Sequence, residues 1–106
     1  MSNIITSESR VRALRALAAA TLRLGLHDRA EANFLDAIAA ARRLGLAPLE
    51  REANVHLAFV YVRTARFSEA ADLLEQLVPT LEATGPAEQL ATAWGYRAAS
   101  AWYRCE

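Results

Sequence analysis

Few residues of this sequence could take part in chemistry, and the first to consider are its two histidines. His56 follows Glu52 by four residues, and on a helix this spacing puts both side chains on one face, where they could share a proton or a metal ion. A solvated pair one helical turn apart is the more ordinary interpretation, and we adopt it. His27 falls in an expected turn, and neither histidine belongs to a known zinc or di-iron pattern. We therefore predict no metal ion and no cofactor.

The remaining candidate nucleophile is Cys105, next to the last residue. It is the single cysteine, so it cannot form an internal disulfide, and this fits a reducing cytoplasm. The sequence contains no glycine-rich phosphate loop and no GxSxG string. Because no acid, base and nucleophile converge, we predict no catalytic residue and a protein that is not an enzyme.

The composition of the 106 residues limits the partner classes. All 12 basic residues are arginine, and 12 acidic residues balance them, so no net charge favours nucleic acid or an anionic membrane. The apolar runs are too short to span a bilayer. Hydrophobic residues make up 54% of the chain, mostly as the helix formers Ala and Leu, which predicts an all-α fold. The absence of lysine suggests a bacterial source.

The elements that must position these residues are marked by Gly25, Gly45 and Gly85, each where apolar periodicity lapses. We expect helices over residues 7–24, 28–44, 48–64, 68–84 and 87–104. Asp28 and Ser68 are expected to cap the second and fourth helices. Short loops make neighbouring helices antiparallel. Pro79 should kink or end the fourth helix.

A shift of the sequence by 40 residues tests for an internal repeat. It pairs Gly45 with Gly85, Ala18 with Ala58, and Ala30 with Ala70. The count of identities is low for a chain so rich in Ala and Leu, but the placement is informative. Small residues fall where two antiparallel helices would approach closely. We therefore predict that Ala18 abuts Ala30 and that Ala58 abuts Ala70.

These residues resemble the tetratricopeptide repeat. The second unit carries the signature most clearly, and its members are Leu57, Ala58, Tyr61, Ala65, Phe67, Ala70, Leu74 and Leu77. The first unit fits with Leu14, Leu17, Ala18, Thr21, Gly25, Ala30, Phe34 and Ala37. The resemblance implies one domain over 1–106, with units 8–46 and 48–85 and a final lone helix at 87–104. Its implied fold is a right-handed α–α superhelix of about five antiparallel helices. The period resembles longer-helix variants found in sensor regions of large bacterial transcription regulators.

The resemblance also implies an inner groove, lined by the first helix of each pair. Glu52 lies on this stripe, and the predicted groove residues are Arg12, Arg15, Arg23, Val55, His56, Phe59, Val62, Arg63 and Tyr96. Arginine beside aromatic rings suits a peptide that carries a carboxylate and apolar side chains. The alternative is that the arginines form a solvated face and pair locally with acids such as Glu8.

The last helix is apolar on nearly all sides, and no further helix follows to cover it. Its predicted self-association stripe comprises Trp94, Ala98, Ala101, Trp102 and Cys105. Because closed two-fold dimers are the commonest oligomers, we expect a homodimer through this helix. The alternatives are a capping partner protein, a longer array, or a helix folded back across the end of the bundle.

Taken together, these patterns predict a protein-interaction or self-association module of the bacterial cytoplasm. Its partner would be a protein or peptide, bound as a helix or an extended segment in the groove or at the apolar edge. No direct contact with nucleic acid or membrane is expected. The alternative function is effector sensing, in which the groove of a regulator holds a small molecule or a signalling peptide.

Overall fold

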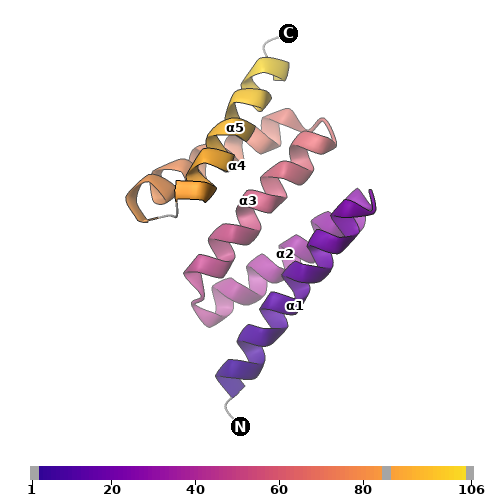
Figure 1. Cartoon of the computed structure of the whole chain (residues 1–106), viewed down its shortest axis with the longest axis vertical. Helices are drawn as coiled ribbons and strands as arrows, with labels where there is room; N and C mark the ends of the chain where they lie inside the picture. Colours follow the sequence, from indigo (N-terminus) through magenta and orange to yellow (C-terminus); the bar gives the residue numbers. More distant parts are fainter. Residues whose placement is uncertain (1–2, 85–86, 105–106) are drawn as a thin grey trace. The chain divides into compact units, whose positions relative to one another are not determined.

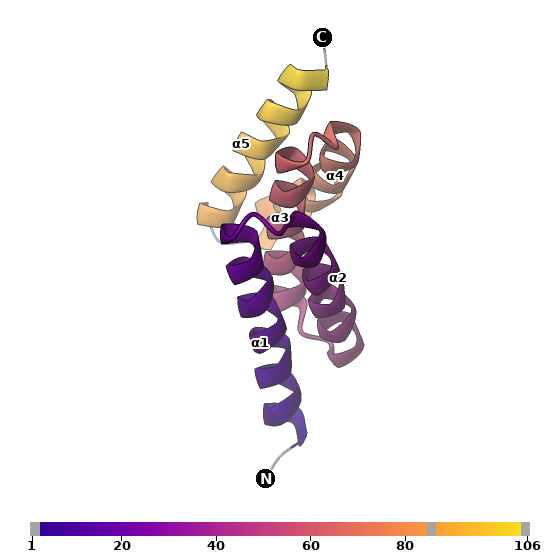
Figure 2. The same ribbon diagram turned by 90° about the vertical axis from the view of Figure 1, so that its right-hand side faces the viewer.

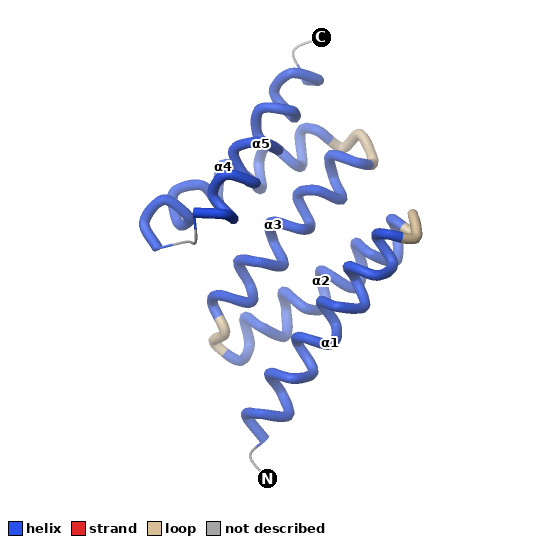
Figure 3. Tube along the Cα trace, in the orientation of Figure 1, coloured by secondary structure: helices blue, strands red, loops and turns tan. Residues whose placement is uncertain are grey.

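A computed structural model describes residues 3–84 and 87–104, with side-chain environments over 8–83 and at positions 87, 89, 91–96 and 98. The described residues form α1 (Asn3–Arg23), α2 (His27–Leu44), α3 (Ala47–Arg63), α4 (Phe67–Thr84) and α5 (Ala87–Arg104) (Figure 1). No strand occurs among them (Figure 3). The predicted all-α fold of five helices is confirmed. The predicted ends lie within one residue of the observed ends, except that α1 begins four residues earlier.

The three described turns share one hydrogen-bond pattern. After α2, the amide of Gly45 donates to the carbonyl three residues back (3.2 Å), and the amide of Leu46 donates to the carbonyl five residues back (2.9 Å). Equivalent bonds close the turns at Gly25 and Ala65. This is the Schellman motif, whose central residue adopts positive φ. The φ angles are 79° and 69° at the two glycines and 61° at Ala65, where a side chain makes this conformation unfavourable.

Each turn also begins the next helix, and this corrects the predicted caps. The carbonyl of Leu26 accepts the first bond of α2, from Ala30 at 2.9 Å, and no side chain caps this helix. Asp28 lies instead in the first turn of α2, where a negative charge is favourable. Ser68 likewise lies inside α4, which begins at Phe67. The carbonyl of the turn residue thus accepts the first bond of the helix, while the first-turn amides of α2 receive no side-chain cap.

The chain packs as two compact units, Met1–His56 and Leu57–Glu106. In the first unit, α1 and α2 run antiparallel and side by side in both views (Figure 1, Figure 2). Ala18 and Ala30 are both fully buried, as close approach of these helices requires. A core cluster at the other end of the unit contains Val11, Ala40, Ala41 and Leu49, with Leu46 packed against it.

In the second unit, α4 packs against α5. Leu74, Leu81 and Val60 are its largest fully buried side chains, and Ala58 and Ala70 are buried completely. The prediction that Pro79 could end α4 is wrong, because the helix continues to Thr84. Proline lacks an amide hydrogen, so the carbonyl of Glu75 does not receive its helical hydrogen bond from position 79.

Helix α3 is the most enclosed helix of the chain. No residue from Leu49 to Val62 is exposed, and Arg63 is the first that is. Its buried residues occupy several sides of the helix, so it has no single apolar stripe. The surface that α3 offers to a ligand is therefore limited to its half-buried residues, which include Glu52 and His56.

Candidate functional site

The main polar cluster of the first unit joins α1 to α3. Arg15 donates from Nη1 to the Oε1 atom of Glu52, and both side chains are about 30% exposed. The Nε atom of Arg15 is buried, and no hydrogen-bond partner for it occurs among the described residues. A buried donor without an acceptor is unfavourable. Because Nε is buried, a ligand can reach only the exposed part of this side chain.

His56 lies one helical turn after Glu52 and stacks on a ring from α2. The ring centroids of His56 and Phe34 are 5.6 Å apart, with an interplanar angle of 14°. Burial lowers the pKa of His56, the nearby Glu52 carboxylate opposes this shift, and the positive charge of Arg15 adds to it. His56 is therefore favoured in its neutral form, and it extends the polar cluster with a flat, partly apolar surface.

The other two predicted arginines of α1 differ from Arg15. Arg12 pairs with Glu8 at 2.8 Å on the exposed side of the helix. The alternative of a solvated, locally paired face therefore holds for Arg12. Arg23 is exposed and takes part in no ion pair within the described part of the chain. Its charge adds to that of Arg15 as a positive contribution from α1.

Val55 does not fit the predicted groove. Its side chain is only 4% exposed, so it belongs to the core and offers no binding surface. The physical reason is that α3 is enclosed on several sides. Its buried residues are therefore not confined to the side that packs against one partner helix. Sequence reasoning assumed one open stripe along this helix.

The remaining predicted groove residues lie in the second unit. Phe59 and Tyr96 form a tilted ring pair with centroids 5.3 Å apart. Burial raises the pKa of the Tyr96 hydroxyl. Val62 is half-buried and Arg63 is exposed. The structure thus brings Phe59 together with Tyr96, and separately brings Arg15 together with His56.

The predicted self-association stripe is described in part. Trp94 is 44% exposed, and Ala98 is exposed on the same side of α5. Ala101 and Trp102 belong to α5, but their side chains, together with Cys105, lie outside the described residues. The opposite side of this helix faces the core, where Ala93 is completely buried.

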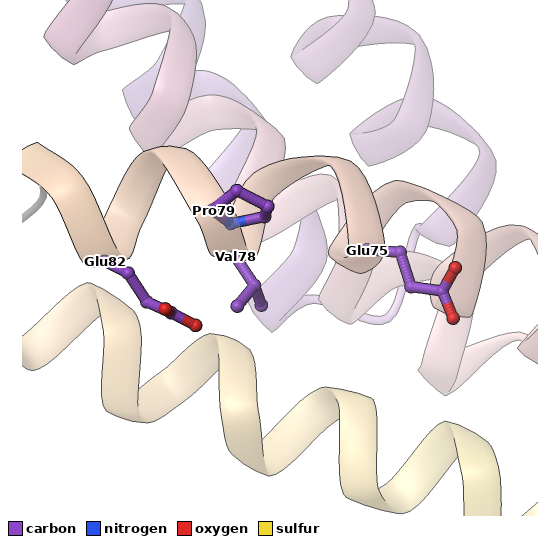
Figure 4. A pocket seen from close by; sticks show the side chains of 4 residues that line it. All are labelled: Glu75, Val78, Pro79 and Glu82. Atoms are coloured by element: carbon purple, nitrogen blue, oxygen red, sulfur yellow. The ribbon is translucent and has the colours of Figure 1, made fainter.

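A cavity of about 400 Å³ lies along α4. Glu75, Val78, Pro79 and Glu82 line it, and Figure 4 shows Val78 directed toward the α5 ribbon. It lies open along one helix, and two of its four lining residues are carboxylates. This arrangement differs from the enclosed, mainly apolar sites that bind small molecules.

Other classes of site were sought over the same residues. No group of three or more His, Cys, Asp or Glu side chains within the described ranges could hold a metal ion. Across those ranges, no helix combines the length and the apolar character that crossing a membrane requires.

Sequence reasoning found Glu52 and His56 but missed Phe34 as the ring on which His56 stacks. Phe34 had been assigned only to the repeat signature.

Comparison with known proteins gives one match. A family profile described as "Tetratricopeptide repeat" matches residues 9–83, well over half of the chain. No curated protein and no solved structure matches the chain significantly. The matched residues include most of α1, all of α2 and α3, and most of α4, and thus the polar cluster of Arg15, Glu52 and His56.

Proposed function

Because this chain belongs to the tetratricopeptide repeat family, whose repeats generally mediate protein–protein interaction, we propose that it is a non-enzymatic peptide-binding module. The site is the face of the first unit where α1 and α3 meet, and its central residues are Arg15, Glu52 and His56. The ligand is a peptide that carries a carboxylate next to an apolar side chain.

The partly exposed guanidinium of Arg15, held in place by Glu52, is the observation that supports this proposal. A carboxylate of the peptide would bind the exposed part of this planar group. Glu52 already holds Nη1, so it fixes the orientation of the guanidinium before the ligand arrives. Such preorganisation reduces the entropy that binding loses.

The stacked rings of His56 and Phe34 support the apolar part of the ligand. Phe34 is completely buried and His56 is half-buried, so the exposed edge of the imidazole is a firm surface. Because burial lowers its pKa, the ring stays neutral near pH 7 and adds no second charge beside Arg15. Arg15 and Glu52 are then the charged groups of the site, and the exposed part of the Arg15 guanidinium is the group that attracts a carboxylate.

Fluorescence anisotropy with labelled peptides tests this function. The probes are two otherwise identical apolar-rich peptides, one with a Glu and one with a Gln at the same position. We expect the wild type to prefer the Glu peptide at least fivefold, and Arg15→Gln to abolish this preference. Equal affinity of the wild type for both peptides would contradict the proposal.

Two further variants control for charge and for folding. Arg10→Gln removes the same charge from the same helix, about 140° away around its axis, and should leave the preference unchanged. Arg23→Gln changes an exposed residue that folding does not require, and should weaken binding of both peptides by less than Arg15→Gln. If Arg10→Gln weakens the Glu peptide as much as Arg15→Gln does, only general electrostatic attraction is involved.

Effector sensing is the alternative function. It would need an enclosed cavity for a small molecule, whereas the cavity on α4 is open and lined by a single helix. The cavity described on α4 therefore does not support this alternative.

A further inference from the structure

The exposed face of α5 has a composition that its own chain does not explain. Ala87, Ala91, Trp94, Gly95 and Ala98 are all exposed, and helical periodicity puts them on one side of the helix. We call this set the α5 face. It combines one large aromatic side chain with four small residues, which is a pattern of close helix packing.

Gly95 is the most informative residue of the α5 face. Glycine inside a helix is destabilising relative to alanine, so a reason for its presence is needed. Apart from its own helix backbone and its two neighbours, a Cβ atom added at Gly95 would meet no atom of the described residues within 4 Å, and the φ angle of Gly95 is not positive. Neither packing inside the chain nor backbone conformation therefore requires glycine here. A close approach from outside the chain would require it.

The order of residues on the α5 face is complementary to itself. Consider two α5 helices that pack antiparallel about a point between Trp94 and Gly95. A residue on one side of this point then lies level with the residue of the second copy that is equally far from the point on its other side. Trp94 then lies level with Gly95 of the second copy, and Ala91 lies level with Ala98 of the second copy. Each layer offers either a large residue with a glycine or two alanines, so the helices can approach closely without a clash.

A helix pair of this kind already exists within the chain. The antiparallel helices α1 and α2 bury Ala18 and Ala30 completely. Ala98 lies 80 residues after Ala18, two repeat periods along, yet it is exposed. A docked helix would give Ala98 the environment that Ala18 has. Because a foreign helix would need no two-fold pattern on the α5 face, the self-complementary order favours a second copy as the occupant.

We propose that the α5 face is a self-association surface, on which α5 of a second copy docks antiparallel with its centre between Trp94 and Gly95. An 18-residue helix is about 27 Å long, so the described face covers the first two-thirds of the contact. Burial of the exposed part of Trp94 in both copies supplies much of the stabilisation. The surface is separate from the peptide site on the first unit.

Sedimentation equilibrium over a range of concentrations tests the proposal. The wild type should form a reversible dimer, and Trp94→Glu should be monomeric while its helical circular dichroism is retained. Leu17→Glu is the matched control, because Leu17 is exposed to a similar extent (51%) but lies on α1. It should leave the dimer unchanged. A monomeric wild type at all concentrations, or a dimer that Leu17→Glu dissociates, would overturn the proposal.

Gly95→Leu keeps the test valid if Trp94→Glu fails to fold. Space around Gly95 is open within the chain, so the leucine should not disturb the monomer. In the dimer it would meet Trp94 of the second copy, and the dissociation constant should rise at least tenfold. An unchanged dissociation constant would place the contact elsewhere.

Disulfide trapping tests the antiparallel orientation. In a Cys105→Ser background, a chain with Ala91→Cys should crosslink on oxidation to a chain with Ala98→Cys, because these positions lie level. Ala91→Cys alone should not crosslink to itself, since the two copies of position 91 are about 10 Å apart along the helix axis. Efficient self-crosslinking of Ala91→Cys would show a parallel pair and would contradict the proposal.

Discussion

Helices α3 and α5 carry alanines forty residues apart, and the surroundings of these two alanines differ. Ala58 on α3 is completely buried, whereas Ala98, forty residues later, is exposed. On α3 no residue between Leu49 and Val62 is exposed, while α5 presents Trp94 and several small residues to solvent. Two alanines at the same repeat spacing can therefore differ completely in burial. The following variants test how far this difference extends.

The largest difference is expected for a buried charge. Ala58→Glu would place a carboxylate in a completely enclosed position, at a cost of several kcal/mol, which is comparable to the whole stability of a small domain. Ala98→Glu would place the same group in solvent and leave the monomer folded. Thermal unfolding followed by circular dichroism measures both. Equal loss of stability in the two variants would show that Ala98 is enclosed in solution.

Replacing a large side chain of α3 or α5 by alanine should give a smaller difference in the free energy of unfolding. Leu57 on α3 is 3% exposed, so Leu57→Ala should lower the free energy of unfolding by about 2–5 kcal/mol. Trp94→Ala removes many more atoms, but Trp94 is 44% exposed and should cost less than half as much in the monomer. Urea unfolding at a concentration below dimerisation measures both values. A larger loss for Trp94→Ala would reverse the comparison.

The backbone conformation of the turn after α3 should affect the free energy of unfolding by about 1 kcal/mol. Ala65 adopts a φ angle of 61°, which disfavours any residue with a side chain, so Ala65→Gly should raise the free energy of unfolding by about 1 kcal/mol. Gly45, at the end of α2, adopts a φ angle of 69° and no side chain obstructs it, so Gly45→Ala should lower the free energy by a similar amount. Urea titration of the two variants should give midpoints that shift in opposite directions.

The smallest expected effect is a change in the free energy of unfolding with pH, caused by His56 on α3. Burial lowers the pKa of His56 in the folded state, so the unfolded chain binds a proton more readily below about pH 7. The contribution of His56 to stability should therefore fall as the pH drops through its unfolded pKa, and level off below its folded pKa. His56→Gln removes this dependence, while Glu52 and Arg15 remain in both proteins. Urea midpoints at pH 7.5 and pH 5.5 should differ less in the variant than in the wild type.

Local sequence patterns were sufficient to predict the helices and their order. Glycine at positive φ ends a helix through its own backbone, so Gly25 and Gly45 marked two boundaries correctly. Ala65 continues the same series at an interval of 20 residues, a spacing that the three glycines alone did not reveal. The predicted side-chain caps were wrong because the helices begin earlier than expected, so that Asp28 and Ser68 lie inside α2 and α4 and not before them.

The site was less predictable because it depends on how helices rotate about their axes. Glu52 and His56 could be assigned to one face from their spacing, but the stacking of His56 on Phe34 depends on the relative rotation of α2 and α3. Val55 was placed on the surface for the same reason, since its burial depends on neighbours far away in the sequence. From the sequence, a close helix contact explains Gly95 inside the last helix, but the open space around Gly95 is a property of the folded chain.

One feature of α3 bears on how the protein unfolds. The boundary between the two compact units falls between His56 and Leu57, inside a continuous helix of 17 residues. If one unit unfolded, its half of α3 would unfold with it, and the other unit would keep only a short piece of this helix. Short helix fragments are not stable alone in water. Denaturation is therefore expected to be a single cooperative transition, in contrast to repeat arrays that fray one unit at a time.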